Sequence, residues 1–286
     1  MIPTAFEYER ATSLDDALAK LAAAGGAGKL IAGGHSLVPL MKLRLSEPTV
    51  LIDIAHIPDF AGIREVGGVI EIGAGATHHD VATSMLLRDG CPVVAEAAAT
   101  IGDQQVRNRG TLGGSLAHAD PAADYPAVML ALDADLHLKG PGGWRSVGAR
   151  GFFRGLLTVD LAPDEILARV TFAPVRAAAY AKLQQRASRF AVVGVAAAVD
   201  VRDGRIASAR VGLTGASPTP SRLTSVEEAL AGRQVSSDTI AAAVAVAGDG
   251  IEDLNDDIHA SADYRRAMIR VFTRRALDRA LARVAV

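Results

Sequence analysis

A junction between a short apolar strand and a helix, made through two adjacent glycines, restricts the fold of this chain most strongly. Residues 29–32 (Lys-Leu-Ile-Ala) predict the strand, and residues 33–36 (Gly-Gly-His-Ser) the turn. Residues 37–45 then predict a helix, in which Pro39 is tolerated because it lies in the first turn.

Signals on either side of this junction extend the pattern. Ser13 is expected to cap a helix that ends at Gly25-Gly26, and residues 50–54 (Val-Leu-Ile-Asp-Ile) predict the next strand. The first sixty or so residues therefore predict a β-α-β unit.

The glycine pair has a chemical consequence as well as a structural one. Glycines let successive backbone N–H groups face one concavity and let a ligand approach closely, which suits a phosphate at the start of a helix. The Ser36 hydroxyl can add one more hydrogen bond. The alternative is an ordinary strand-to-helix turn, because the motif matches neither the Rossmann fingerprint nor the P-loop.

A second glycine-rich segment occupies residues 105–116 and includes Thr111. Its small residues are expected to expose backbone N–H groups beside the Thr111 hydroxyl, which makes a second potential phosphate cradle. Two cradles suit the pyrophosphate of a dinucleotide. Asp124 follows, and it can accept hydrogen bonds from sugar hydroxyls, cap a helix over residues 126–132, or do both.

Composition excludes several classes of function. The 286 residues favour two or three lobes, and the net charge of -2 gives no general attraction to nucleic acid or to an anionic membrane. The single cysteine, Cys91, excludes an internal disulfide and a self-contained iron–sulfur cluster, and is expected to be buried. No transmembrane segment and no secretory signal is recognisable. We expect a cytoplasmic protein, with the inner face of the membrane reached only through partners.

Residues 32–45 (Ala-Gly-Gly-His-Ser-Leu-Val-Pro-Leu-Met-Lys-Leu-Arg-Leu) and 111–124 (Thr-Leu-Gly-Gly-Ser-Leu-Ala-His-Ala-Asp-Pro-Ala-Ala-Asp) closely resemble the FAD-binding medium subunits of the xanthine oxidase, or molybdenum hydroxylase, family. The resemblance covers essentially the whole chain, including residues 263–266 (Asp-Tyr-Arg-Arg), and is nearest to medium subunits of the aerobic carbon monoxide dehydrogenase type.

This resemblance implies an α+β chain with the FAD-binding fold of the vanillyl-alcohol-oxidase (PCMH) type. Two α/β lobes, at about 1–58 and 59–175, would form the FAD-binding domain. Residues 176–286 would form a C-terminal lobe with a three-stranded antiparallel sheet and helices.

The resemblance also assigns site residues. The two glycine loops would hold the pyrophosphate, Ile101 and Gly102 would line the flavin pocket, and Leu167 would lie near the adenine. The residues expected to contact FAD are Ala32, Gly33, Gly34, His35, Ser36, Leu37, Ile101, Gly102, Val106, Gly110, Thr111, Gly113, Gly114, Ser115, Asp124, Leu167, Lys182 and Phe190. No catalytic residue and no metal ligand is expected in this chain.

Two positions depart from the family pattern. Phe190 stands where some carbon monoxide dehydrogenases have tyrosine, and Ser115 where asparagine is frequent. These departures bear on substrate identity more than on flavin binding.

The C-terminal third can also be interpreted from its own residues. Residues 191–199 predict an apolar strand, Asp203-Gly204 a hairpin turn, and residues 206–213 a half-buried strand in which Ile206 shares a face with Ser208. The final helix has Tyr264, Met268, Val271, Phe272 and Leu277 at helical spacing, which favours packing on its own core over a docking role.

The resemblance implies a relay function. The chain would take electrons from two [2Fe-2S] clusters of a small subunit and pass them to an acceptor such as a quinone. A large subunit would hold the molybdenum–molybdopterin cofactor, and the assembly would be a dimer of heterotrimers. The alternatives are a medium subunit for an N-heterocycle, nicotine, purine or aldehyde substrate, and, in another class, a nucleotide-binding assembly module without redox function.

Overall fold

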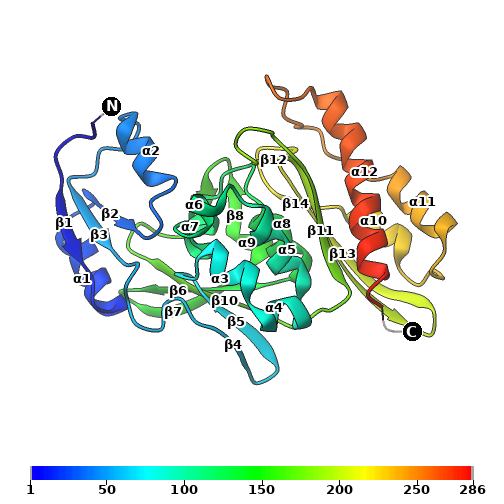
Figure 1. The fold of residues 1–286 in the computed structure, drawn as a ribbon, viewed down its shortest axis with the longest axis horizontal. Helices are drawn as coiled ribbons and strands as arrows, with labels where there is room; N and C mark the ends of the chain where they lie inside the picture. Colours follow the sequence, from blue (N-terminus) through cyan, green and yellow to red (C-terminus); the bar gives the residue numbers. More distant parts are fainter. Residues whose placement is uncertain (1, 285–286) are drawn as a thin grey trace.

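The computed structural model describes residues 2–284. Three parts follow one another along its long axis in sequence order: a small N-terminal sheet, a central part, and a C-terminal sheet beside a long helix (Figure 1). This order confirms the expected mixture of helix and sheet in successive lobes.

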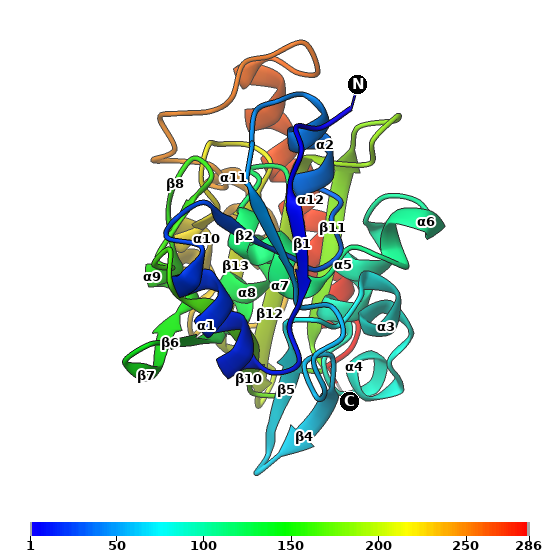
Figure 2. The ribbon, with the colours of Figure 1, turned by 90° about the vertical axis from the view of Figure 1, so that its left-hand side faces the viewer.

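The N-terminal part is a parallel three-stranded sheet in the order β1-β3-β2, with two helices that stand in front of the central part in Figure 2. Ser13 caps the first helix as expected, since its side chain accepts a hydrogen bond from the N–H of Asp16 at 3.0 Å. The second helix ends before residue 45, because Arg44 adopts a left-handed conformation with φ 60°. The elements are β1 (Glu7–Arg10), α1 (Leu14–Ala23), β2 (Gly28–Ile31), α2 (Leu37–Lys42) and β3 (Val50–Asp53).

The central part is built on a five-stranded antiparallel sheet in the order β4-β5-β10-β6-β7. Cys91, between two of its helices, is fully buried as expected, and burial raises the pKa of its thiol to about 12. The strands are β4 (Ile63–Val66), β5 (Val69–Gly73), β6 (Asp135–Gly140), β7 (Gly143–Gly148), β8 (Phe153–Gly155), β9 (Thr158–Val159) and β10 (Ile166–Phe172). The helices are α3 (His78–Thr83), α4 (Met85–Gly90), α5 (Pro92–Thr100), α6 (Gln104–Arg107), α7 (Leu112–His118), α8 (Tyr125–Leu132) and α9 (Ala149–Phe152).

The C-terminal sheet has the order β11-β12-β13-β14. It thus contains the three long antiparallel strands that were expected and a fourth of only two residues. The predicted hairpin turn is confirmed, because Asp203 and Gly204 have φ 51° and 72°, as a tight two-residue turn requires. The elements are β11 (Ala178–Gln184), β12 (Ala191–Arg202), β13 (Arg205–Thr214), β14 (Ser221–Arg222), α10 (Thr224–Leu230), α11 (Ser237–Ala245) and α12 (Ala262–Leu281).

Strand β12 is buried on both faces. Ala196 and Ala198 belong to the hydrophobic core that fills the first two parts, whereas Val195, Ala197 and Val199 belong to a second core under α12. Helices α5 and α8 pack on the inner side of this sheet and α10 and α12 on the outer side. The C-terminal sheet is therefore a wall shared by two cores.

Two expectations for the C-terminal part are wrong in detail. A register shift between β12 and β13, after Asp200, places Ile206 in the same core as Ala209 and Val211, and Ser208 on the exposed face. The extra residue of a β-bulge interrupts strict alternation, so Ile206 and Ser208 do not share a face.

The packed face of α12 also differs from the expected stripe. Tyr264 and Val271 are 47 % and 37 % exposed, whereas Arg265 is buried and donates hydrogen bonds to the carbonyl oxygens of Val192 and Gly215. Phe272 and Leu277 are buried as expected. Among the described residues, no helix is long and apolar enough to cross a membrane.

Candidate cofactor site

The structure brings the two glycine loops into backbone contact. A Cβ atom added to Gly33 would lie 2.2 Å from the carbonyl oxygen of Arg109 and 2.7 Å from Cα of Gly110. No side chain fits between the loops at this point, so a glycine is required on the N-terminal side. Segments more than seventy residues apart in the sequence therefore form one concavity.

The first loop leaves its backbone donors unpaired. The N–H groups of Gly33, Gly34, His35 and Ser36 reach no acceptor within residues 2–284, and the Ser36 side chain makes no capping bond. Gly34 has φ 71°, which a residue with a side chain rarely adopts. Nδ1 of His35 lies 2.9 Å from the carbonyl oxygen of Gly33, so this imidazole fixes the loop. Four successive free donors fit a pyrophosphate.

The second loop uses its donors internally, which corrects the expectation of exposed N–H groups there. The N–H of Gly113 donates to the carbonyl oxygen of Ala74 at 2.8 Å, that of Gly114 to Oγ1 of Thr111 at 3.1 Å, and that of Ser115 to the carbonyl oxygen of Thr111 at 3.0 Å. Thr111 is the N-cap of α7, so its hydroxyl accepts one hydrogen bond and still has a proton to donate.

The glycines of the second loop serve close packing. A Cβ on Gly113 would lie 2.4 Å from Cβ of Ala74, and one on Gly110 would lie 2.6 Å from Nε2 of His78. His78 is buried, and its Nδ1 lies 3.1 Å from the Tyr125 hydroxyl. Burial is the main cause that lowers the pKa of His78 to about 4, with smaller effects of the positive charges of His35 and Arg107.

Asp124 is the centre of a buried network that joins α8 to β11. Oη of Tyr180 donates to Oδ1 of Asp124 at 2.5 Å, and Nζ of Lys182 lies 2.9 Å from the same oxygen. Burial raises the pKa of Asp124, and Lys182 and Tyr180 oppose this shift. The side chain makes no capping bond to α8, so the predicted capping role is wrong. Two donors from the C-terminal sheet take it instead.

The same network holds the turn at Ile101 and Gly102. Nζ of Lys182 also donates to the carbonyl oxygen of Thr100 at 3.1 Å, one residue before the turn. Gly102 has φ 47°, and a Cβ there would lie 2.7 Å from Cβ of Val106. Val106 therefore packs under the turn that was expected to line the flavin pocket.

The remaining predicted residues, Phe190, Leu167, Ala32 and Leu37, lie outside the Asp124 network. Phe190 is 48 % exposed on the β11–β12 connection. Leu167 is buried in β10, beside Ala168, whose carbonyl oxygen accepts from Ala74; Ala74 in turn accepts from Gly113. Ala168, the neighbour of Leu167 in β10, is thus connected to the second glycine loop through Ala74 by two backbone hydrogen bonds. Ala32 and Leu37 flank the first loop and are partly buried.

Sequence reasoning missed Tyr180 and Arg189. The one signal for Tyr180 is Gly194, a glycine inside an apolar strand, where a Cβ would lie 2.2 Å from the Tyr180 hydroxyl. The family resemblance places Arg189 in the segment 182–190, which would approach the flavin ring, but it gives this residue no role of its own. In the structure, Nη1 of Arg189 donates to the carbonyl oxygen of Gly102 at 3.1 Å.

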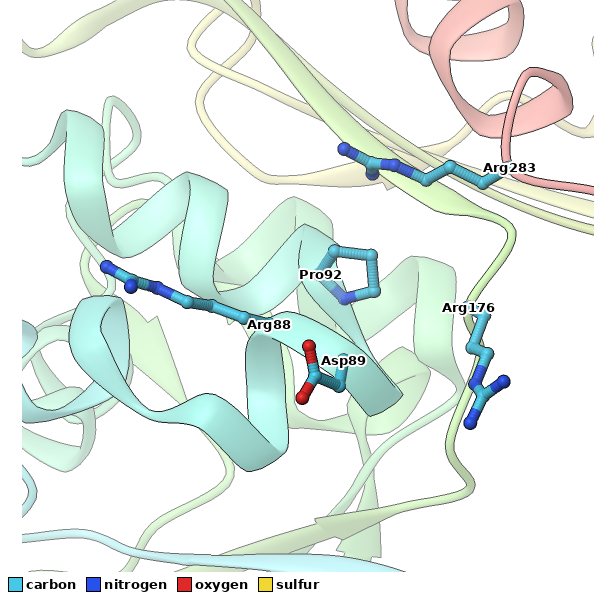
Figure 3. Close-up of a pocket in the computed structure, with 5 residues that line it drawn as sticks. All are labelled: Arg88, Asp89, Pro92, Arg176 and Arg283. Carbon is cyan, nitrogen blue, oxygen red and sulfur yellow. The ribbon is translucent and has the colours of Figure 1, made fainter.

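Two cavities lie outside the glycine loops. The larger, about 580 Å³, is lined by Arg88, Asp89, Pro92, Arg176 and Arg283, and its guanidinium groups do not converge on one point (Figure 3). It has no contact with the residues expected to bind FAD. The smaller, about 320 Å³, lies beside Phe190. Within the described residues, no group of His, Cys, Asp and Glu side chains could hold a metal ion.

Comparison with known families agrees with this geometry. Residues 4–175 match the model of the FAD binding domain in molybdopterin dehydrogenase, and residues 178–280 match the CO dehydrogenase flavoprotein C-terminal domain. The chain belongs to the family of FAD-binding medium subunits of molybdenum hydroxylases. It is an oxidoreductase subunit with FAD as its cofactor, and its solved relatives are named for a molybdenum cofactor with a Mo-pyranopterin moiety and for a Cu,Mo centre.

Individual relatives span the whole chain. The carbon monoxide dehydrogenase medium chain of Hydrogenophaga pseudoflava is 39% identical over 100% of both chains. The 6-hydroxypseudooxynicotine dehydrogenase complex subunit alpha of Paenarthrobacter nicotinovorans is 37% identical over 99% of this chain and 97% of its own. The solved structure of carbon monoxide dehydrogenase from Hydrogenophaga pseudoflava, in a form lacking the Mo-pyranopterin moiety, matches with a TM-score of 0.95 and 40% identity over 100% of both chains.

Proposed function

We propose that this chain is the FAD-binding relay of an aerobic carbon monoxide dehydrogenase. The observation that carries the cofactor assignment is the run of four unpaired N–H groups from Gly33 to Ser36, set against the second glycine loop. These donors would hold the pyrophosphate, and the hydroxyl proton of Thr111 would add one hydrogen bond from the opposite side.

The sugar, adenine and flavin parts of FAD would contact the other residues that were expected to bind the cofactor. A carboxylate can accept more hydrogen bonds than the two from Tyr180 and Lys182, so that of Asp124 would also accept from sugar hydroxyls. Leu167 would lie near the adenine. The flavin ring would lie beside Ile101, Gly102 and Phe190, with Lys182 holding the turn before Gly102. The remaining expected contacts are Ala32, Leu37, Val106, Gly110, Gly113, Gly114 and Ser115, of which Gly110 and Gly113 also allow close packing on His78 and Ala74.

The flavin supplies the electron chemistry when bound, and this chain supplies binding and orientation. In the proposal, two [2Fe-2S] clusters of a small subunit deliver the electrons, and an external acceptor such as a quinone receives them. A large subunit holds the molybdenum cofactor and the substrate, in a dimer of heterotrimers. The complex works in the cytoplasm and meets the membrane only through partners.

Carbon monoxide is the proposed substrate because the carbon monoxide dehydrogenase medium chains of two organisms match at 39% and 37% identity over almost the whole chain. The relative named for 6-hydroxypseudooxynicotine, also at 37%, supports an N-heterocycle-related substrate as the alternative. Assays of the purified complex with carbon monoxide and with nicotine-type substrates separate the two. In the same proposal, the FAD-binding domain covers residues 1–175, with lobes at about 1–58 and 59–175, and the C-terminal domain covers residues 176–286.

The deciding experiment is the absorption spectrum of the purified complex. Flavin bands, and release of FAD on denaturation, support the relay. A colourless chain that binds nucleotides would instead support an assembly module without redox function. Substrate should still reduce the iron–sulfur clusters of a flavin-depleted complex, because substrate is oxidised in another chain. Failure of that reduction would contradict the assignment of chemistry to the large subunit.

Gly34→Val tests the first loop directly. Gly34 has φ 71°, so valine would distort the loop and displace its neighbouring donors. We expect the complex to lose FAD while keeping its molybdenum and iron content. Gly68→Val is the matched control, because Gly68 has φ 80° with open space around it in the turn between β4 and β5. It should carry a similar backbone strain and retain FAD.

A further inference from the structure

The connection between β11 and β12 is closed by hydrogen bonds around Arg189, which adopts a left-handed conformation. The N–H of Gln185 donates to the carbonyl oxygen of Phe190 at 2.8 Å, and the N–H of Arg189 donates back to Gln185 at 2.9 Å. The hydroxyl of Ser188 donates to Oε1 of Gln185 at 2.9 Å. Inside this network Arg189 has φ 62°, a left-handed conformation that is uncommon for a residue with a side chain.

The conformation directs the Arg189 side chain across to the central part. Nη1 of Arg189 donates to the carbonyl oxygen of Gly102 at 3.1 Å. Arg107, from the other side, donates to the same oxygen at 2.9 Å and to the carbonyl oxygen of Ile101 at 3.0 Å. Two guanidinium groups from different parts of the fold thus converge on one turn.

Neither cation is neutralised by a salt bridge. Within residues 2–284, no carboxylate lies within 4.0 Å of the Arg189 or the Arg107 guanidinium. The positive charge of Arg189 reaches the neighbouring groups: burial and, less strongly, this charge lower the pKa of Lys182. The N–H of Val106 is the main cause that lowers the pKa of Asp103, the residue after the turn, and the charges of Arg189 and Arg107 lower it further. One carboxylate thus partly offsets the two guanidinium charges, which leaves an excess of positive charge at Ile101 and Gly102.

We propose that Arg189 is a positioning residue that holds the turn at Gly102 and places a positive charge where it favours reduced over oxidised flavin. This inference rests on the proposed function, in which Ile101, Gly102 and Phe190 lie beside the flavin ring. It assigns to this loop a control of the redox potential rather than of binding.

The charge balance gives the direction of the effect. Uptake of two electrons from the partner's iron–sulfur clusters and of one proton from solvent adds one negative charge to the ring system. A fixed cation stabilises that charge and so raises the midpoint potential. The external acceptor then removes the two electrons, and the proton returns to solvent. Removing the cation should lower the potential without removing the cofactor.

The test is the flavin midpoint potential of the purified complex, measured by dye equilibration, in wild type and in R189Q. Glutamine keeps an N–H donor for Gly102 but carries no charge. We expect unchanged FAD content and a roughly tenfold weaker preference for the reduced flavin, which is about 30 mV for a two-electron couple. R189K restores the charge and should restore most of the potential.

Arg186 supplies the matched control, because it is exposed on the same loop and makes no hydrogen bond within the described part of the chain. R186Q should keep the wild-type potential. An equal shift in R186Q, or an unchanged potential in R189Q with full flavin content, would overturn the inference while leaving the proposed function standing. Loss of FAD from R189Q would also overturn it, because Arg189 would then bind the oxidised cofactor. A wild-type complex without flavin would refute the proposed function and the inference together.

Discussion

The two glycine loops of this chain have similar composition and different physical roles. From Gly33 to Ser36, glycine conformations leave four backbone donors free, and the helix that follows is short and partly exposed. From Gly110 to Ser115, almost every donor is already used within the protein, and the glycines allow backbones and side chains to pack at distances that a Cβ would prevent. One loop presents hydrogen bonds, and the other supports it.

This difference teaches that a glycine motif does not by itself identify a ligand contact. Gly33 belongs to both roles, since it lies in the first loop but packs against Arg109 of the second. Substitutions in the two loops should therefore separate stability from cofactor affinity.

Gly113→Val should have the largest effect, and on stability. Its Cβ would lie 2.4 Å from Cβ of Ala74 and 2.9 Å from the Ala74 backbone, which is hydrogen-bonded on both sides. We expect a loss of about 3 kcal/mol or more in the free energy of unfolding, measured by denaturant titration. Gly142→Val, at a glycine with nothing within 4 Å, should be close to neutral. A stable Gly113→Val variant that merely lost FAD would show that the second loop is also a donor loop.

The stability of the protein should depend on pH through His78, which packs against Gly110 of the second loop. Its pKa is lowered to about 4 in the folded protein, against about 6.5 in the unfolded chain. The unfolded state thus binds more protons between these values, so stability is fully present above pH 6.5 and falls as the pH decreases toward 4. The whole window corresponds to about 3 kcal/mol, and roughly 2 kcal/mol should be lost at pH 5.

Unfolding midpoints of wild type and His78→Gln at pH 7 and pH 5 test this dependence. The variant should lose much of the pH dependence. His79→Gln removes an exposed imidazole from the same helix and serves as the control. Identical pH profiles for wild type and His78→Gln would show that protonation of His78 does not destabilise the protein.

Thr111→Val should have a smaller effect on stability than the changes at Gly113 and His78, and it should also weaken FAD binding. Loss of the N-cap of α7 should lower stability by about 1 kcal/mol, and loss of a hydroxyl donor should weaken FAD roughly tenfold or more. Thr111→Ser keeps both functions. Ser36→Ala, in the first loop, removes a hydroxyl without a capping bond and should affect FAD affinity alone. FAD affinity is measured by equilibrium titration and stability by thermal unfolding. A loss of stability in Ser36→Ala would show that the first loop also has a structural role.

Local signals in the sequence were sufficient for much of the fold. Ser13 as a cap and the turn at Asp203-Gly204 depend on neighbouring residues, and both are present. Features set by packing were not predictable in this way. The bulge near Ile206 depends on how β13 pairs with β12, and the burial of Arg265 depends on how the last helix packs on the sheet. Neighbouring residues in the sequence do not determine either contact.

The candidate site divides in the same way. The glycine loops stand out in the sequence because their residue types are unusual, but which N–H groups remain free is decided by contacts with Ala74 and Thr111. Asp124 was recognised as a polar residue of the site, yet its partners Tyr180 and Lys182 lie more than fifty residues away. Only the fold shows that these side chains satisfy its carboxylate.

The shared wall formed by β12 limits the modularity of the chain. Family models divide the sequence between residues 175 and 178, as if two exchangeable units met there. Alternate side chains of β12 nevertheless belong to both cores. A cut at that boundary would expose the apolar inner face of the C-terminal sheet, and it would leave the core of the N-terminal half uncovered on the side where that sheet packs. The two halves are separable as families but not as folding units, and an exchange of C-terminal halves between relatives would have to carry the matching inner face with it.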